Sequence, residues 1–279
     1  MTFWGILRDG TEQLLGEPEE AALSYDRDAP ADLLQAVFPA DRLWGELVRV
    51  TVYDQGKAVF RGMVDEQNAR LSSSGFSIQL VCRSLEAILL DNEAQPGILR
   101  DPSLELLERR LLEPLGFPGV LGDRGRRRGE LKVEKGESCW AVAERFCREF
   151  LGTEPWVDGD GILHCGELPQ QKLELTDILR AEVSFLPCKR LSAVWQQSYR
   201  GSYDTPYRDP GAAQTRQRFL SMQSGKNPKE LLHDGERESF QIMAECAGAW
   251  WPVRGARASL TLARAGRFED CPVRGALYL

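Results

Sequence analysis

The sequence has few of the residues that usually build a catalytic or metal centre. Its 279 residues include two histidines, His164 and His233, so a histidine-based metal site would be short of ligands. Its seven cysteines are odd in number, scattered and never spaced as CxxC, which gives no sign of a disulfide framework or zinc knuckle and predicts buried, reduced thiols. No glycine-rich nucleotide-binding motif occurs. We therefore predict no enzyme activity, no catalytic or metal-binding residues and no cofactor.

Long apolar runs and a surplus of positive charge are also missing. No run of about 18 apolar residues is present, so no membrane span is predicted. The amino terminus, MTFWGILRDGTEQ, lacks the basic head and apolar stretch of a signal peptide, which predicts synthesis in the cytosol. The net charge of −7 argues against general affinity for nucleic acid. The basic run at 123–129 is interpreted as a solvated loop, with a docking patch for an acidic partner as the alternative.

The strongest pattern that is present is a succession of three strands. Residues 46–54 alternate with period two, Gln55 and Gly56 supply a turn in which Gly56 permits a positive φ, and residues 57–71 continue as a second strand. Gly62 is expected to mark a bulge or tight bend, and residues 72–75 turn into a third strand. Three antiparallel strands leave two edges, which need partners from a closed barrel or from another subunit.

The rest of the chain is organised around this block. Ser84 is expected to cap a helix over 85–91, which closes a β-rich region at 1–97. Residues 98–175 change to an α/β character, with helices capped by Ser103 and Ser138. Residues 176–279 return to β patterns. Two β-rich regions therefore flank a small α/β insertion, an α+β class dominated by strands.

A few residue pairs and clusters have side chains that could carry chemistry or bind a ligand. Asp158 to Gly161, DGDG, is interpreted as a hairpin turn because the further ligands of a calcium loop do not follow. Neighbouring acids such as Asp65 and Glu66 diverge on a strand, as do His164 and Cys165. The tryptophan cluster AWWPV at 249–253 is interpreted as core or interface packing.

A resemblance to a known family covers roughly residues 45–166. The segments RVTVYDQGKAVFRGMVDE, GFSIQLVCRSLEAILLDNEA and VEKGESCWAVAERFCREFLGTEPWVDGDGILHCG occur in this order. Together they resemble the late-control-D-like baseplate hub proteins of contractile phage tails and of related prophage or bacteriocin particles. Each motif is weak alone, and the order and spacing carry the resemblance.

The resemblance implies a structural role. Such proteins form a homotrimeric ring with a central channel, in which two tube-type β-barrel domains per subunit match the six-fold tail tube on one side and the three-fold spike on the other. It implies a first barrel at 1–97, an insertion domain at 98–175 and a second barrel at 176–279, reduced or completed by a neighbouring protein. The implied partners are further copies of the chain, the tail tube protein, the spike protein and other baseplate proteins, without membrane or specific nucleic-acid binding. The implied location is the bacterial host cytoplasm, followed by assembly into a virion or tail-like particle.

Two other functions remain open from the sequence. One is a cell-wall hydrolase carried on a tail tip, with acids near Asp65 or Asp158 as candidates. The other is a glycan-binding β module that uses Trp250 and Trp251.

Overall fold

A computed structural model describes residues 1–73 and 75–279 of the protein. The chain forms two compact units. The first unit comprises Met1–Glu174, Ala249–Ser259 and Phe268–Leu279, and the second comprises Leu175–Gly248 and Leu260–Arg267. The chain therefore leaves the first unit and later returns to it. The predicted division at 97 and 175 remains a prediction. None of the helices in the described residues is long and apolar enough to span a membrane.

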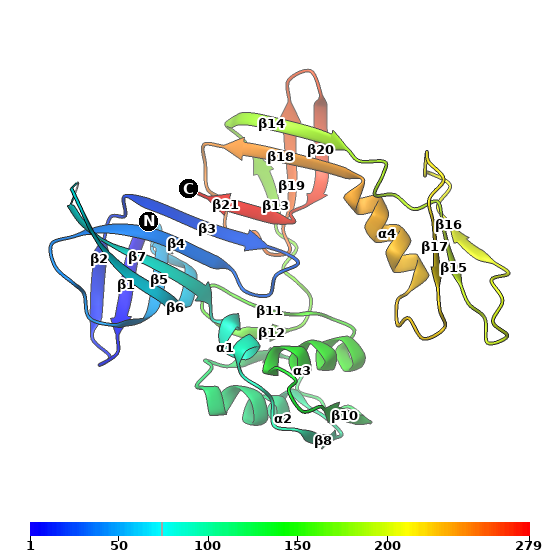
Figure 1. Ribbon diagram of the computed structural model, residues 1–279, viewed down its shortest axis with the longest axis horizontal. Coiled ribbons are helices and arrows are strands. Elements are labelled where there is room, and N and C mark those ends of the chain that lie inside the picture. The colour runs from blue at the N-terminus through cyan, green and yellow to red at the C-terminus, as the bar shows by residue number, and fades with distance from the viewer. Residues whose placement is uncertain (74) are drawn as a thin grey trace. The chain divides into compact units, whose positions relative to one another are not determined.

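The first unit is built on an eight-stranded antiparallel sheet (Figure 1). The order across the sheet is β2-β1-β5-β6-β7-β4-β3-β21. The strands are β1 (Thr2–Leu7), β2 (Glu12–Gly16), β3 (Glu20–Asp26), β4 (Leu33–Ala40), β5 (Leu47–Asp54), β6 (Lys57–Ser72), β7 (Gly75–Ser84) and β21 (Gly275–Tyr278). The last of these comes from the C-terminal end of the chain and pairs with β3, from the N-terminal region.

The sheet curls around one apolar core. Three strands separate β1 from β4, so a flat sheet would hold them about 19 Å apart at ~4.8 Å per strand. The rings of Phe3 on β1 and Phe38 on β4 nevertheless lie 5.4 Å apart, edge to face. Both residues belong to a cluster that also includes Leu15, Val50 and Ile78.

The β-rich α+β class is as predicted, but no closed barrel is found in the described residues. The sheet ends on β2 at one side and on β21 at the other. The edges expected for the three-strand block, at β5 and β7, are instead paired with β1 and β4 of the same chain.

The local predictions around the opening hairpin are largely confirmed. Gln55 and Gly56 both have positive φ, 47° and 80°, as the two-residue turns that suit twisted hairpins require. Gly62 is a place of close approach rather than a bulge: a Cβ there would overlap the carbonyl oxygen of Arg83, while the register of β6 shifts between Val64 and Glu66. The predicted turn at 72–75 includes residue 74, which lies outside the described residues.

The predicted cap at Ser84 is wrong. Helix α1 (Glu86–Asp91) follows Leu85 without a side-chain cap. The Ser84 hydroxyl instead accepts a hydrogen bond from the backbone N–H of Asp32, at 2.8 Å. The Ser84 hydroxyl thus bonds a backbone N–H 52 residues away in the chain instead of capping the helix beside it.

The rest of the first unit has its own core. Its elements are β8 (Gly97–Arg100), α2 (Leu104–Leu107), a π-helical turn (Glu108–Leu112), a 3-10 turn (Glu113–Leu115), β9 (Val120–Gly122), β10 (Glu130–Val133), α3 (Cys139–Phe146), a second π-helical turn (Cys147–Leu151), β11 (Pro155–Val157) and β12 (Leu163–Cys165). Ser103 and Ser138 cap α2 and α3, as predicted. Leu104, Leu111 and Phe146 pack together with Cys147.

The second unit contains β14 (Ile178–Phe185), β15 (Ala193–Gln196), β16 (Pro206–Arg208), β17 (Gln217–Leu220), α4 (Pro228–Glu238) and β18 (Phe240–Cys246). β14 and β18 form a two-stranded antiparallel sheet, and β16-β15-β17 form a three-stranded one. A further sheet of order β13-β19-β20, with β13 (Lys172–Leu175), β19 (Arg257–Leu262) and β20 (Gly266–Pro272), has residues that belong to each unit.

Candidate assembly surfaces

The second unit has almost no apolar core. Among its described residues, the buried apolar side chains are Ala193, Val194, Pro228 and Leu260. Its large apolar side chains lie mostly at the surface; the exposed ones are Leu179, Phe185, Tyr199, Tyr207, Phe219, Met222 and Met243. A segment of this length that buries so little cannot offset its loss of conformational entropy by itself.

The two-stranded sheet of this unit has one apolar face. Register pairs Phe185 with Phe240, Val183 with Ile242, and Ala181 with Ala244, so all six side chains point to the same side. None of them is buried, and Phe185 is 74% exposed. An isolated two-stranded sheet is marginal in water, so this face needs a covering element.

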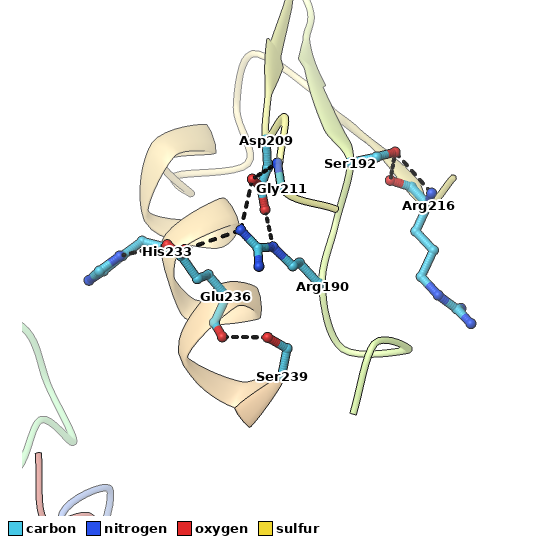
Figure 2. A network of polar contacts seen from close by, with 8 residues as sticks. All are labelled: Arg190, Ser192, Asp209, Gly211, Arg216, His233, Glu236 and Ser239. Atoms are coloured by element: carbon cyan, nitrogen blue, oxygen red, sulfur yellow. Dashed lines mark hydrogen bonds and ion pairs between the residues drawn. The ribbon is translucent and has the colours of Figure 1, made fainter. Parts of the chain in front are cut away.

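A polar network, rather than a core, holds α4 against the three-stranded sheet. Figure 2 shows Arg190 between the helix and the loop that follows β16. Its guanidinium donates to Asp209 through Nε and through Nη2, the latter at 3.0 Å, and Nη2 also donates to Glu236 of α4 at 3.1 Å. The hydrogen bond from Arg190 lowers the pKa of Asp209. Because directional ion pairs replace packing, the exposed apolar side chains remain available.

The first unit presents open sheet edges. Trp4 of β1 lies opposite Leu14 of the edge strand β2, and both side chains are exposed. At the other edge, Leu277 of β21 is exposed. Edge strands offer unpaired N–H and C=O groups to another chain. An apolar side chain beside each edge makes both edges candidates for contact with neighbouring subunits.

A third sheet edge lies along the C-terminal half of β6, and side-chain hydrogen bonds satisfy part of it. The pairing of β5 with β6 ends at Met63, and among the described strands residues 64–72 pair with β7 alone. The Gln67 side chain accepts the N–H of Leu47 at 2.9 Å and donates to the carbonyl of Gly45 at 3.1 Å. These two hydrogen bonds replace backbone bonds that a neighbouring strand would make near Gln67. The part of β6 after Gln67 is therefore the open part of this edge.

The two acids proposed for a hydrolase serve local structure. Asp65 pairs with Arg83 at 2.6 Å, and Arg83 also pairs with Asp91 at 2.6 Å. Asp158 accepts the N–H groups of Asp160 and Ile162, the bonds of a tight turn, and its other oxygen lies 2.7 Å from Nε2 of His164. Asp158 lines a cavity of the first unit that Asp65 does not line. The structure does not bring the two acids together as a catalytic pair.

The two tryptophans proposed for glycan binding do not form a shared flat platform. Trp251 stacks on Tyr278 with ring centroids 3.8 Å apart and donates to Asp54 at 3.2 Å. The carbonyl oxygen of Trp250 accepts the Tyr278 hydroxyl at 2.6 Å. Trp251 lines the same cavity as Asp158, and Trp250 does not.

Metal-ligating residues do not gather either. Within residues 1–73 and 75–279, no three His, Cys, Asp or Glu side chains are placed to hold an ion. All seven cysteines are free; Cys82, Cys139, Cys147 and Cys165 are buried as predicted. Cys188 is exposed and the remaining two are partly exposed, contrary to the prediction of burial, because they lie outside the two main cores.

Comparisons with known proteins place the fold. No family model and no curated protein matches the sequence. Among solved structures, the 43 kDa tail protein of prophage MuSo2 from Shewanella oneidensis is similar with a TM-score of 0.77 at 16% identity, over 99% of this chain and 92% of that one. The tail protein from Neisseria meningitidis MC58 is similar with a TM-score of 0.69 at 20% identity, over the same shares.

A third similar structure comes from a secretion system. It is an E. coli component of the type VI secretion system, described as structurally similar to the T4 bacteriophage tail proteins gp27 and gp5. It matches with a TM-score of 0.51 at 9% identity, over 92% of this chain and 71% of that one. The chain therefore has the fold of phage tail proteins along nearly its whole length.

Proposed function

We propose that the protein is the structural hub of a phage-tail-like baseplate, a homotrimeric ring with a central channel that joins the six-fold tail tube to the three-fold spike. The observation that carries the proposal is the second unit, which has four buried apolar side chains among its described residues and exposes more large ones at its surface. A unit of this kind is stabilised when neighbouring subunits cover it. The fold that the chain shares with phage tail proteins supports the same structural role.

Identical copies are the proposed cover for the apolar face of β14 and β18. Burying an exposed side chain such as Phe185 contributes roughly 1.5–3 kcal/mol, so a few such side chains contribute substantially to an interface. A ring closes when each copy presents one surface to the next around an axis. The open edges at β2 and β21 are further surfaces for such contacts or for the tube and spike proteins.

The proposed role needs shape rather than chemistry. The acids Asp65 and Asp158 are engaged in ion pairs and turn bonds, so neither is offered as a catalytic group. The net charge of −7 is compatible with a channel through which DNA slides without being held. In this proposal the protein is made in the bacterial host and assembled into a virion or related particle.

The test is the mass of the purified protein and its capture of partners. We expect a trimer by native mass spectrometry, a ring with a central hole by negative-stain microscopy, and co-purification with co-expressed tail tube and spike proteins. A monomer at all concentrations that also fails to retain the tube and spike proteins would reject the hub.

A further inference from the structure

A cavity of about 610 Å³ lies within the first unit. Residues of strands β3, β5 and β6 line it, together with the turn between β11 and β12 and the segment Trp251–Arg254. Sites for small molecules usually have volumes of roughly 300–1,000 Å³. The cavity is therefore large enough for a ligand, and all of it belongs to one unit of one chain.

Three polar atoms at this cavity have no partner. They are Oε2 of Glu86, Nε of Arg61 and Nε1 of Trp156, and each is buried without a hydrogen bond. Seven such side-chain atoms occur in the described residues, and three of them belong to residues that line this cavity. Glu86 is only 2% exposed. Buried polar groups are nearly always paired, and each unpaired one costs roughly 1–3 kcal/mol.

Two ion pairs already occupy four of the charged groups at this cavity. Asp32 pairs with Arg254 at 2.7 Å, and Asp160 pairs with Arg61 at 3.2 Å through another nitrogen of the guanidinium. The buried atoms without a partner are one carboxyl oxygen and two N–H donors, and the exposed ammonium of Lys57 also lines the cavity. A neutral ligand with hydroxyl groups satisfies this set. A hydroxyl both donates and accepts, so one kind of group suits all three atoms.

Aromatic rings supply the apolar part of the wall. Trp156 and Trp251 line the cavity, and both are partly exposed. Each ring is fixed in place by stacking, Trp156 on His164 at 4.0 Å between centroids and Trp251 on Tyr278 at 3.8 Å. A rigid aromatic wall beside a few convergent polar groups suits a ligand that has both an apolar face and polar edges. A sugar ring has both, because its C–H groups form one face and its hydroxyls the rim.

We propose that this cavity binds a neutral saccharide of one or two rings, whose hydroxyls pair with Glu86, Arg61 and Trp156 and whose ring packs against the aromatic wall. Sugar binding goes beyond the proposed structural role. It does not depend on the ring, since one chain supplies every residue that lines the cavity. It also revises the glycan-binding hypothesis from the sequence: Trp251 takes part, Trp250 does not, and the polar partners come from three other segments.

The test uses a panel of neutral hexoses, N-acetylglucosamine and their disaccharides. Binding is followed by saturation-transfer NMR and by the tryptophan fluorescence of the intact protein. We expect saturable binding of at least one sugar. Glu86→Leu and Trp156→Phe, which remove one polar partner each while keeping volume or ring, should each weaken it at least tenfold. Glu86→Gln serves as the conservative variant, and Trp4→Phe on the outer side of the sheet should change nothing.

Three results would overturn the proposal. One is the absence of saturable binding across the panel in the folded protein, which would leave the cavity to water. Another is binding that none of the Glu86 and Trp156 variants weakens. The third is tighter binding of N-acetyl-lysine methylamide than of every sugar, which would assign the cavity to a basic side chain of a partner protein. Trimer formation is measured separately, so either idea can fail without the other.

Discussion

Arg254 and Asp32 are 222 positions apart in the chain, yet Nη2 of Arg254 lies 2.7 Å from Oδ1 of Asp32 in a largely buried ion pair. The Arg254 guanidinium also lies over the ring of Tyr25, 4.7 Å from its centroid. Together with the donation from Trp251 to Asp54, this contact fixes the returning segment to the N-terminal sheet. The first unit is thus closed by residues from both ends of the chain.

Removing the cation of this pair should destabilise the first unit. Arg254→Met leaves Asp32 buried without its partner, and we expect the free energy of unfolding to fall by about 3 kcal/mol, because breaking a buried pair strands a charge. The double variant with Asp32→Asn should recover part of the loss. Urea unfolding at neutral pH measures all three proteins.

The matched control is the exposed pair of Arg8 and Glu46, which is highly accessible on both sides. Arg8→Met should change stability by no more than about 0.5 kcal/mol. Equal effects of the two substitutions would show that the Arg254 pair is not structurally important.

Glu86 should make the protein less stable as the pH rises. Burial, followed by the charge of Asp32, raises the pKa of Glu86 to about 7 from its usual 4.5. The folded state then holds the proton more tightly than the unfolded chain, so this group lowers stability progressively between pH 4.5 and pH 7. The full difference is about 3 kcal/mol above that window.

The variant Glu86→Gln isolates this effect. It should unfold like the wild type near pH 4 and be more stable at pH 8, with the exposed Glu12→Gln as the control that shows no such difference. Measuring urea midpoints at both pH values gives the comparison. A wild type that is as stable as Glu86→Gln at pH 8 would mean that the Glu86 carboxylate is well solvated or paired.

Short-range features were predictable from the sequence because neighbouring residues determine them. The Gln55–Gly56 turn and the caps at Ser103 and Ser138 depend on groups within a few positions. Helix α4 was missed although its start carries the usual signals, Asn227 as the cap and Pro228 at the first helical position. The residues that follow it, Phe240–Cys246, alternate as a strand does, and the sequence therefore predicted β structure for the whole region.

Long-range features were not predictable, because no local signal encodes them. The pairing of β21 with β3 joins the two ends of the chain, and the Ser84 hydroxyl is used by Asp32 rather than by the helix beside it. The three unpaired groups of the cavity come from β6, α1 and β11, and only the folded chain brings them together.

Gly62 should be intolerant of a side chain. A Cβ at this position would overlap both the carbonyl oxygen of Arg83 and the ring of Phe60, and the backbone atom cannot move without breaking the β6 and β7 ladder. Gly62→Ala is expected to destabilise by roughly 1–3 kcal/mol. Gly166→Ala, where nothing lies within 4 Å, is the control and should be nearly neutral. Thermal unfolding compares the two, and equal melting temperatures would contradict the packing described.

Assembly should depend on one face of the β14 and β18 sheet. Phe185 and Met243 are 74% and 75% exposed, but register puts Phe185 on the apolar face with Phe240 and Met243 on the opposite face beside Glu182. Because both are accessible in a single chain, Phe185→Gln and Met243→Gln should both fold, as circular dichroism can verify. If the protein forms the proposed trimer, we expect Phe185→Gln to shift it toward monomer at least tenfold in analytical ultracentrifugation, since the substitution removes an apolar contact worth roughly 2 kcal/mol per interface. Met243→Gln should leave the trimer intact. If the two variants dissociate equally, the apolar face is not the contact between copies, and the edges at β2 and β21 become the surfaces that hold the ring.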